Sequence, residues 1–191
     1  MTFIRYEDTS ADLGAPLVDG NQARKGYREG YFICAKEAAV ALKNRKGDNR
    51  SAMPVLFLYR QYLELAIKDA LHFSKAFDLD QSEEKFRHNL PRLWEEGKKV
   101  LTTFVDADLL SPIDGTVKEF DAIDKGADAF RYPTNNKGEP QLPKDAHVLY
   151  QKLIDDMSEA QTVLELTIDE IRIKEAKLDA DIAEAVANDR S

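Results

Sequence analysis

The chain has 191 residues, of which 32% are charged, and its formal net charge is −8 at pH 7. This length suits one domain with a substantial core rather than two domains. A single cysteine, Cys34, excludes a disulfide framework and a cluster of thiolate metal ligands. The N-terminus lacks a secretion-signal pattern, and no apolar run approaches the roughly 20 residues of a membrane span. We therefore expect a cytoplasmic protein without a membrane segment.

The acidic charge is concentrated near the C-terminus. Residues 155–191 contain eleven Asp or Glu and four Lys or Arg, which leaves the rest of the chain nearly neutral. An acidic segment of this kind repels nucleic-acid phosphates. The basic residues at Arg24, Lys25 and Arg28, and between Lys43 and Arg50, are interpreted as solvated helix ends, with a local basic patch as the alternative.

Apolar residues spaced three or four apart predict helices along most of the chain. Residues 1–20 contain glycine and proline with little periodicity, so they are interpreted as an irregular lead-in. A first helix is predicted over 21–45 and a second, central helix over 51–77. Ser51 is the expected N-cap of the second helix, and Pro54 lies in its first turn, where a missing N–H costs nothing.

Shorter elements follow the central helix. A third helix is predicted from Asn89 or Leu90 to about Phe104, and a fourth opens at Ser111 and closes at Gly126. Between residues 133 and 143, three prolines and an Asn-Asn-Lys-Gly turn predict a surface excursion, with a short hairpin as one form of it.

A long last helix is predicted from near Lys144 to about residue 187. Apolar residues recur every seven positions from Tyr150, and a second column of isoleucines completes a heptad seam. At about 1.5 Å per residue this helix is roughly 65 Å long, too long to lie wholly on the body. Its expected unpartnered residues are Ile168, Ile171, Leu178, Ile182 and Val186. A second copy of the chain would cover them, which predicts a homo-oligomer, unless the helix folds back or frays.

These elements predict an all-α fold. It is an antiparallel bundle of about five helices with a long C-terminal helix and a Pro/Gly-rich excursion near 133–143. The expected organisation is a lead-in over 1–20, the bundle over 21–173 and an acidic helical extension over 174–191.

A row of charged residues crosses the central helix. Arg60, Glu64 and Lys68 lie one helical turn apart, so neighbouring side chains can meet. Apolar residues flank this row on both sides, and we therefore expect Arg60 and Glu64 to be at least partly buried. The row is either a structural ion pair that ties the central helix to the loop before the third helix, or part of a ligand site.

In the ligand-site interpretation, residues further along the chain join this row. His88 precedes a helix start and can reach Glu64 or Arg131, and two arginines with a histidine suit a phosphate-bearing ligand. Tyr132 precedes a proline, which favours an extended backbone that can turn its ring outward. The candidate ligand-binding residues are Arg60, Glu64, His88, Asp128, Arg131 and Tyr132.

Several common chemistries lack the residues that they need. The sequence has no glycine-rich phosphate loop, no HExxH or paired-cysteine metal motif and no Gly-x-Ser-x-Gly nucleophile turn. We therefore expect neither a metal nor a cofactor.

Three segments in order, FLYRQYLELAIKDAL, HNLPRLW and AFRYP, followed by a long last helix, resemble the HEPN (higher eukaryotes and prokaryotes nucleotide-binding) superfamily. HEPN domains occur in toxin–antitoxin, abortive-infection and CRISPR-linked proteins. The resemblance covers about residues 21–173 and implies a helical bundle that pairs with a second copy. Many members of this superfamily are metal-independent ribonucleases, in which the catalytic arginine is followed by a histidine about four to six residues later.

That arginine-to-histidine interval is absent here. No arginine stands at the required distance before His72, His88 or His147, and no histidine follows Arg131 closely. The resemblance therefore implies a non-catalytic homo-oligomer that binds nucleotide, RNA or a protein partner, in a toxin–antitoxin or phage-defence setting. The alternative is a divergent ribonuclease in which Arg60 and Arg131 stabilise the phosphate and His88 transfers the proton.

Overall fold

The computed structural model describes residues 20–77, 88–124, 127–142 and 145–189, and within these ranges it contains five α-helices and no strand. The predicted all-α fold is confirmed. Thr134 and Pro140 form an isolated β-bridge within the predicted excursion. The helices are α1 (Gly20–Lys43), α2 (Ala52–Ser74), α3 (Leu90–Leu101), α4 (Ser111–Ile123) and α5 (Tyr150–Asp189). Residues 1–19, Gly126 and Lys144, on which other boundary predictions fell, lie outside the described residues.

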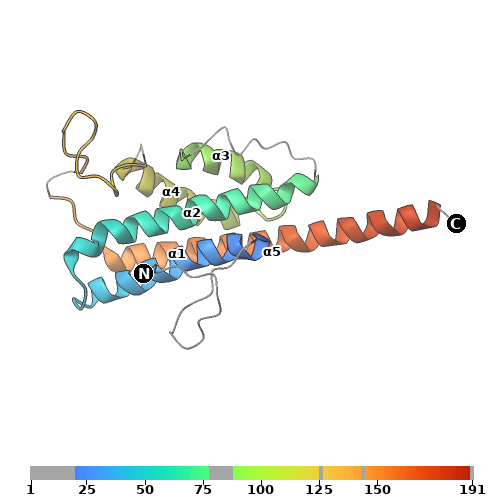
Figure 1. The fold of residues 1–191 in the computed structure, drawn as a ribbon, viewed down its shortest axis with the longest axis horizontal. Coiled ribbons are helices and arrows are strands. Elements are labelled where there is room, and N and C mark those ends of the chain that lie inside the picture. The colour runs from blue at the N-terminus through green and yellow to red at the C-terminus, as the bar shows by residue number, and fades with distance from the viewer. Residues whose placement is uncertain (1–19, 78–87, 125–126, 143–144, 190–191) are drawn as a thin grey trace, which may run out of the picture.

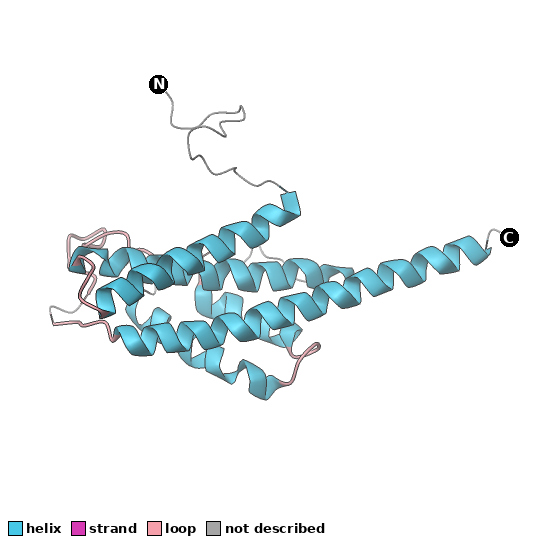
Figure 2. Ribbon diagram, turned by 90° about the horizontal axis from the view of Figure 1, so that it is seen from below, coloured by secondary structure: helices cyan, strands magenta, loops and turns pink. Residues whose placement is uncertain are grey.

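Helix α2 is the central element of the bundle (Figure 1). It packs against α1, α3 and α5, while α4 packs against α3 and α5. Helices α3 and α4 lie along one side of α2, and α1 and α5 lie along the other (Figure 1). The C-terminal part of α5 extends beyond every other described helix (Figures 1 and 2).

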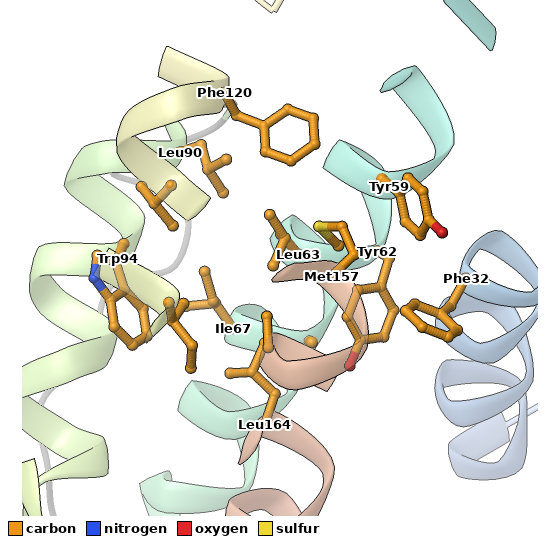
Figure 3. Packing of buried hydrophobic residues seen from close by; sticks show 14 of the residues in the cluster. Phe32, Tyr59, Tyr62, Leu63, Ile67, Leu90, Trp94, Phe120, Met157 and Leu164 are labelled. Carbon is orange, nitrogen blue, oxygen red and sulfur yellow. The ribbon is translucent and has the colours of Figure 1, made fainter. Parts of the chain in front are cut away.

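The core forms where α2 meets the other helices (Figure 3). Tyr59, Leu63 and Ile67 of α2 are completely buried, and Trp94 of α3 and Met157 of α5 pack around them. Burying an apolar side chain of this size contributes about 1.5 to 3 kcal/mol. The wide apolar arc of α2 therefore forms the centre of the hydrophobic core, and α2 is the central helix that the sequence predicts.

Two predicted helix starts have different outcomes. Asn89 is the N-cap of α3, and its side-chain oxygen accepts a hydrogen bond from the backbone N–H of Arg92 at 3.0 Å. Ser51 occupies the predicted N-cap position of α2, but it lies in a 3-10 turn with helical backbone angles and its side chain makes no cap hydrogen bond. A capping side chain needs the extended backbone that an N-cap residue normally has.

Helix α5 begins at Tyr150 rather than near Lys144. The heptad pattern also begins at Tyr150, so nothing in the periodicity supported an earlier start. Ile168 and Ile171 are completely buried, and the expectation that they lie beyond the body is wrong. The reason is that α5 packs along α2 and α1 as far as Ile171, and the Lys174 ammonium still lies 5.3 Å from the ring centroid of Phe104.

The end of α5 does leave the body. Leu178 is half-buried, and every residue from 179 to 188 is exposed. Ile182 is 54% exposed and Val186 45% exposed. Residues 175–189, called the α5 tail below, would span about 22 Å as a helix.

Gly97 sets the distance between α2 and α3. A Cβ atom at this position would lie 2.6 Å from Cγ2 of the completely buried Ile67. We expect Gly97→Ala to lower the free energy of unfolding by about 1 to 3 kcal/mol, as overpacking typically does.

The control is Gly115→Ala in α4, where nothing lies within 4 Å of the added carbon. That change should raise stability by about 0.5 to 1 kcal/mol in urea denaturation. Equal effects at both positions would contradict the packing argument.

Candidate functional site

Arg60 is the centre of a buried polar cluster between α2, α3 and the end of α4. Its side chain is only 3% exposed. Nη1 donates to Glu64 Oε2 at 3.2 Å, and Nη2 donates to the backbone carbonyl of His88 at 2.6 Å. Nε lies 3.3 Å from Oδ2 of Asp124, which is completely enclosed. The predicted burial of Arg60 and Glu64 is confirmed.

Glu64 connects Arg60 to the surface. Its Oε1 accepts a hydrogen bond from the ammonium of Lys68 at 2.6 Å and lies 2.9 Å from Nδ1 of His88. Burial by itself raises the pKa of the Glu64 carboxyl group, but the Lys68 ammonium and the His88 ring outweigh that effect and hold the pKa below its ordinary value. Glu64 is therefore charged at neutral pH and binds two partners besides Arg60.

Asp124 joins the cluster from the segment that follows α4. Its Oδ1 accepts a hydrogen bond from the backbone N–H of Ala129 at 2.8 Å and so holds the turn after α4. Its Oδ2 forms an ion pair with Arg60 but no hydrogen bond of good geometry within the described residues. Asp124 is not among the site residues predicted from the sequence, which include Asp128 instead. The available signal was an acidic residue directly after an amphipathic helix, although its distance from α2 in the chain conceals the contact.

A separate group of contacts surrounds Arg131, and it does not include Arg60. The Arg131 guanidinium donates to Asp128 Oδ1 at 2.6 Å and to the backbone carbonyl of Ala127 at 2.9 Å, and it lies 5.5 Å from the ring centroid of Tyr132. Tyr132 is 55% exposed, so its ring does point outward. Of the candidate set, the contacts join Arg60, Glu64 and His88, and they join Arg131, Asp128 and Tyr132 as a separate exposed group.

The charges of the buried cluster balance. Arg60 and Lys68 supply two positive charges, and Glu64 and Asp124 supply two negative charges. Both Nη atoms of Arg60 donate to protein oxygens and its Nε lies against the Asp124 carboxylate, so a bound phosphate would have to displace a protein group. The arrangement suits a structural role, in which α2 is tied to the start of α3 through His88 and to the end of α4 through Asp124.

His88 is the one member of this cluster with a largely exposed side chain, at 68%. Its Nδ1 lies against the Glu64 carboxylate, which can orient the imidazole as a carboxylate orients a general base. Chemistry at this site would therefore have to pass through the solvent-facing side of the His88 ring.

A second buried cluster, which was not predicted from the sequence, joins α1, α2 and α5. Arg28 is 2% exposed and donates twice to Glu165, from Nε at 2.9 Å and from Nη2 at 2.7 Å. It also bonds to Asp69, and the Tyr62 hydroxyl donates to Glu165 at 3.3 Å. Burial opposes the charged guanidinium, but the two carboxylates outweigh it and raise the pKa of Arg28.

The interpretation of Arg28 as a solvated helix-end residue is wrong. A signal was available, because Arg28 falls on the same face of α1 as the buried Phe32, Ala35 and Ala39. Lys25 and the basic residues from Lys43 to Arg50 are exposed, as expected.

Within the described ranges, no group of three or more His, Cys, Asp or Glu side chains is arranged to hold a metal ion. In the same ranges, no helix combines the length and the apolar character needed to cross a membrane.

Comparison with known proteins does not identify a relative. No family model matches the chain, and neither a curated protein nor a solved structure matches it.

Proposed function

We propose that this protein is a non-catalytic, HEPN-like interaction module that works as a homo-oligomer, with the α5 tail making the contact between copies. The observation that carries the proposal is the exposure of apolar side chains on the tail. Ile182 and Val186 continue the side of α5 that is buried at Leu164, Ile168 and Ile171. An exposed continuation of a buried helix face is typical of an unpartnered interface.

The HEPN-like part of the proposal is supported by the order of the sequence motifs. A homo-oligomer that binds nucleotide, RNA or a protein partner in a toxin–antitoxin or phage-defence setting is what that resemblance implies. The balanced charges around Arg60 favour a protein partner over a phosphate-bearing ligand at this cluster.

Removal of the tail tests the proposal. We expect the full chain to have the light-scattering mass of a dimer or larger assembly at micromolar concentration, and a chain ending at residue 174 to have the mass of a monomer. The same loss is expected for Ile182→Asp with Val186→Asp, because each buried apolar side chain contributes about 1.5 to 3 kcal/mol to the contact. Ile173→Asp is the control, since Ile173 is 65% exposed and lies on the opposite side of α5.

Two outcomes would count against this proposal. A monomeric full chain would reject self-association. A shortened chain that remains a dimer would place the contact on the bundle instead of the tail.

A second candidate function is cleavage of RNA by a rearranged site, and the exposed His88 held by Glu64 is the observation in its favour. We expect purified protein to leave single-stranded and structured RNA intact, because Arg60 and Arg131 are both occupied by protein acceptors. Reproducible cleavage that is lost in His88→Ala but kept in His147→Ala, at an exposed histidine elsewhere, would establish the ribonuclease instead.

A further inference from the structure

The α5 tail has an apolar stripe with acidic edges. Leu178, Ile182 and Val186 follow one another at intervals of four residues and so lie on one side of the helix. Asp179 and Asp181 lie on the two sides of this stripe. Over residues 175–189 the tail has five acidic residues and one basic residue, a net charge of −4.

Two tails packed against each other would repel. Their apolar stripes can meet only if the acidic edges of one tail come close to those of the other. Like charges in such positions are destabilising, and burial of the stripe lowers the local dielectric and strengthens the repulsion. A surface of opposite charge fits the tail better than a second tail does.

The chain carries a surface of that kind on the outer side of α1. This surface, called the α1 outer face, consists of Gly30, Ile33, Lys36, Val40 and Lys43, which are spaced three or four residues apart. Ile33 is 51% exposed and Val40 39% exposed, and both lysines are exposed. A Cβ atom added at Gly30 would have nothing within 4 Å, so another helix can approach closely there.

The charge around the α1 outer face is opposite to that of the tail. Leaving out the buried Arg28, residues 20–50 contain seven basic and three acidic residues, a net charge of +4. Within the described residues, neither Lys36 nor Lys43 has a carboxylate partner within 4 Å. Two acidic residues, Glu29 and Glu37, lie on the same side of α1. Glu29 pairs with Lys25, and Glu37 lies between Ile33 and Val40 in the sequence.

The tail of one chain cannot cover the α1 outer face of the same chain. It belongs to the continuous helix α5 and points away from the bundle (Figure 2). The two surfaces match in length, since the tail spans about 22 Å and the stretch from Gly30 to Lys43 spans about 20 Å at 1.5 Å per residue. A second copy is therefore the occupant that the charges and the geometry favour.

We propose that the α5 tail of one copy docks on the α1 outer face of a second copy, through apolar contacts at Ile33 and Val40 and ion pairs from Lys36 and Lys43 to Asp179 and Asp181. A two-fold dimer would make this contact twice, because each chain supplies one tail and one outer face. The inference rests on the proposed function, self-association through the tail, and adds the surface that receives it.

Exchange of charge between the two surfaces tests the docking. We expect Lys36→Glu with Lys43→Glu, and separately Asp179→Lys with Asp181→Lys, to raise the dimer dissociation constant about tenfold or more at low salt. Each double variant repels itself. A mixture of the two should associate like the wild type, because in the mixed dimer each tail meets an outer face of opposite charge. Sedimentation equilibrium on the full chains measures all three dissociation constants.

Controls separate docking from general charge and folding effects. Lys118→Glu with Lys137→Glu changes the net charge equally at exposed positions on α4 and in the excursion, and should leave the dissociation constant within about twofold of wild type. Far-UV circular dichroism should show unchanged helix content for every variant, since all the substituted side chains are exposed. Glu37→Lys replaces one of the two acidic residues on this side of α1 with a basic residue and should tighten the dimer.

The outcomes distinguish this inference from the proposed function. If the α1 variant associates normally while tail removal still gives a monomer, the docking surface is wrong and self-association through the tail stands. If both double variants dissociate but their mixture is not restored, the docking is likewise rejected. If the wild-type chain is monomeric, the proposed function and the docking fail together.

Discussion

Replacing Arg60 by methionine should lower the free energy of unfolding by about 3 to 5 kcal/mol, because it leaves two buried carboxylates without their shared cation. The side chains of Glu64 and Asp124 are 3% and 1% exposed. In this variant Glu64 keeps its contacts with Lys68 and His88. Asp124 has no other ion pair within the described residues. Urea denaturation followed by circular dichroism, at one fixed protein concentration, measures the loss.

Two further variants make this prediction specific. Arg131→Met removes an arginine whose ion pair with Asp128 is 43% and 50% exposed, and it should cost only about 0 to 1 kcal/mol. The combination of Arg60→Met, Glu64→Leu and Asp124→Asn should recover most of the loss. It removes the stranded charges, while the asparagine side chain still offers an oxygen to the backbone N–H of Ala129. A loss below about 1 kcal/mol for Arg60→Met alone would mean that the cluster does not hold the bundle together.

The helices and their inner faces could be predicted because they depend on local spacing. The α2 pattern identifies both its buried apolar arc and the row of Arg60, Glu64 and Lys68, since residues four apart on one helix must lie on one side. The Asn89 cap is predictable for a similar reason, because its partner, the Arg92 N–H, lies three residues away.

Contacts between distant segments could be predicted only where a motif pointed to them. The position of His88 before a helix start left Glu64 and Arg131 as its two predicted partners, and the contact is with Glu64. Asp124 and Glu165 were missed, since an acidic residue at the edge of a helix looks the same in sequence whether it faces water or a buried arginine. Replacing Arg60 and Glu64 alone by apolar residues would therefore still leave Asp124 without its cation, which the spacing on α2 does not reveal.

The extent of α5 shows a different limitation. Its heptad pattern continues unchanged through Ile171, Leu178 and Ile182, yet only the first of these is completely buried. A heptad pattern states which side of a helix is apolar and not which element covers it. The lengths and positions of α1 and α2 decide where the cover ends.

Arg28 provides the second large expected effect, because it is the only described residue that pairs with carboxylates on both α2 and α5. Arg28→Met should lower the free energy of unfolding by about 3 kcal/mol, because it leaves Asp69 with only the part-exposed Arg24 and Glu165 with only the Tyr62 hydroxyl. The stability of Arg28→Lys should lie between those of the wild type and Arg28→Met, since a single ammonium cannot reproduce the bidentate hydrogen bonds to Glu165.

Arg24 is the matched control for this second prediction. It also pairs with Asp69, at 3.3 Å, but its side chain is 40% exposed, so Arg24→Met should cost about 0 to 1 kcal/mol. Adding Asp69→Asn and Glu165→Gln to Arg28→Met should restore stability, because no buried charge then remains unpaired. If Arg24→Met and Arg28→Met cost the same, burial does not determine the strength of these ion pairs, and the role of Arg28 in joining α1, α2 and α5 is disproved.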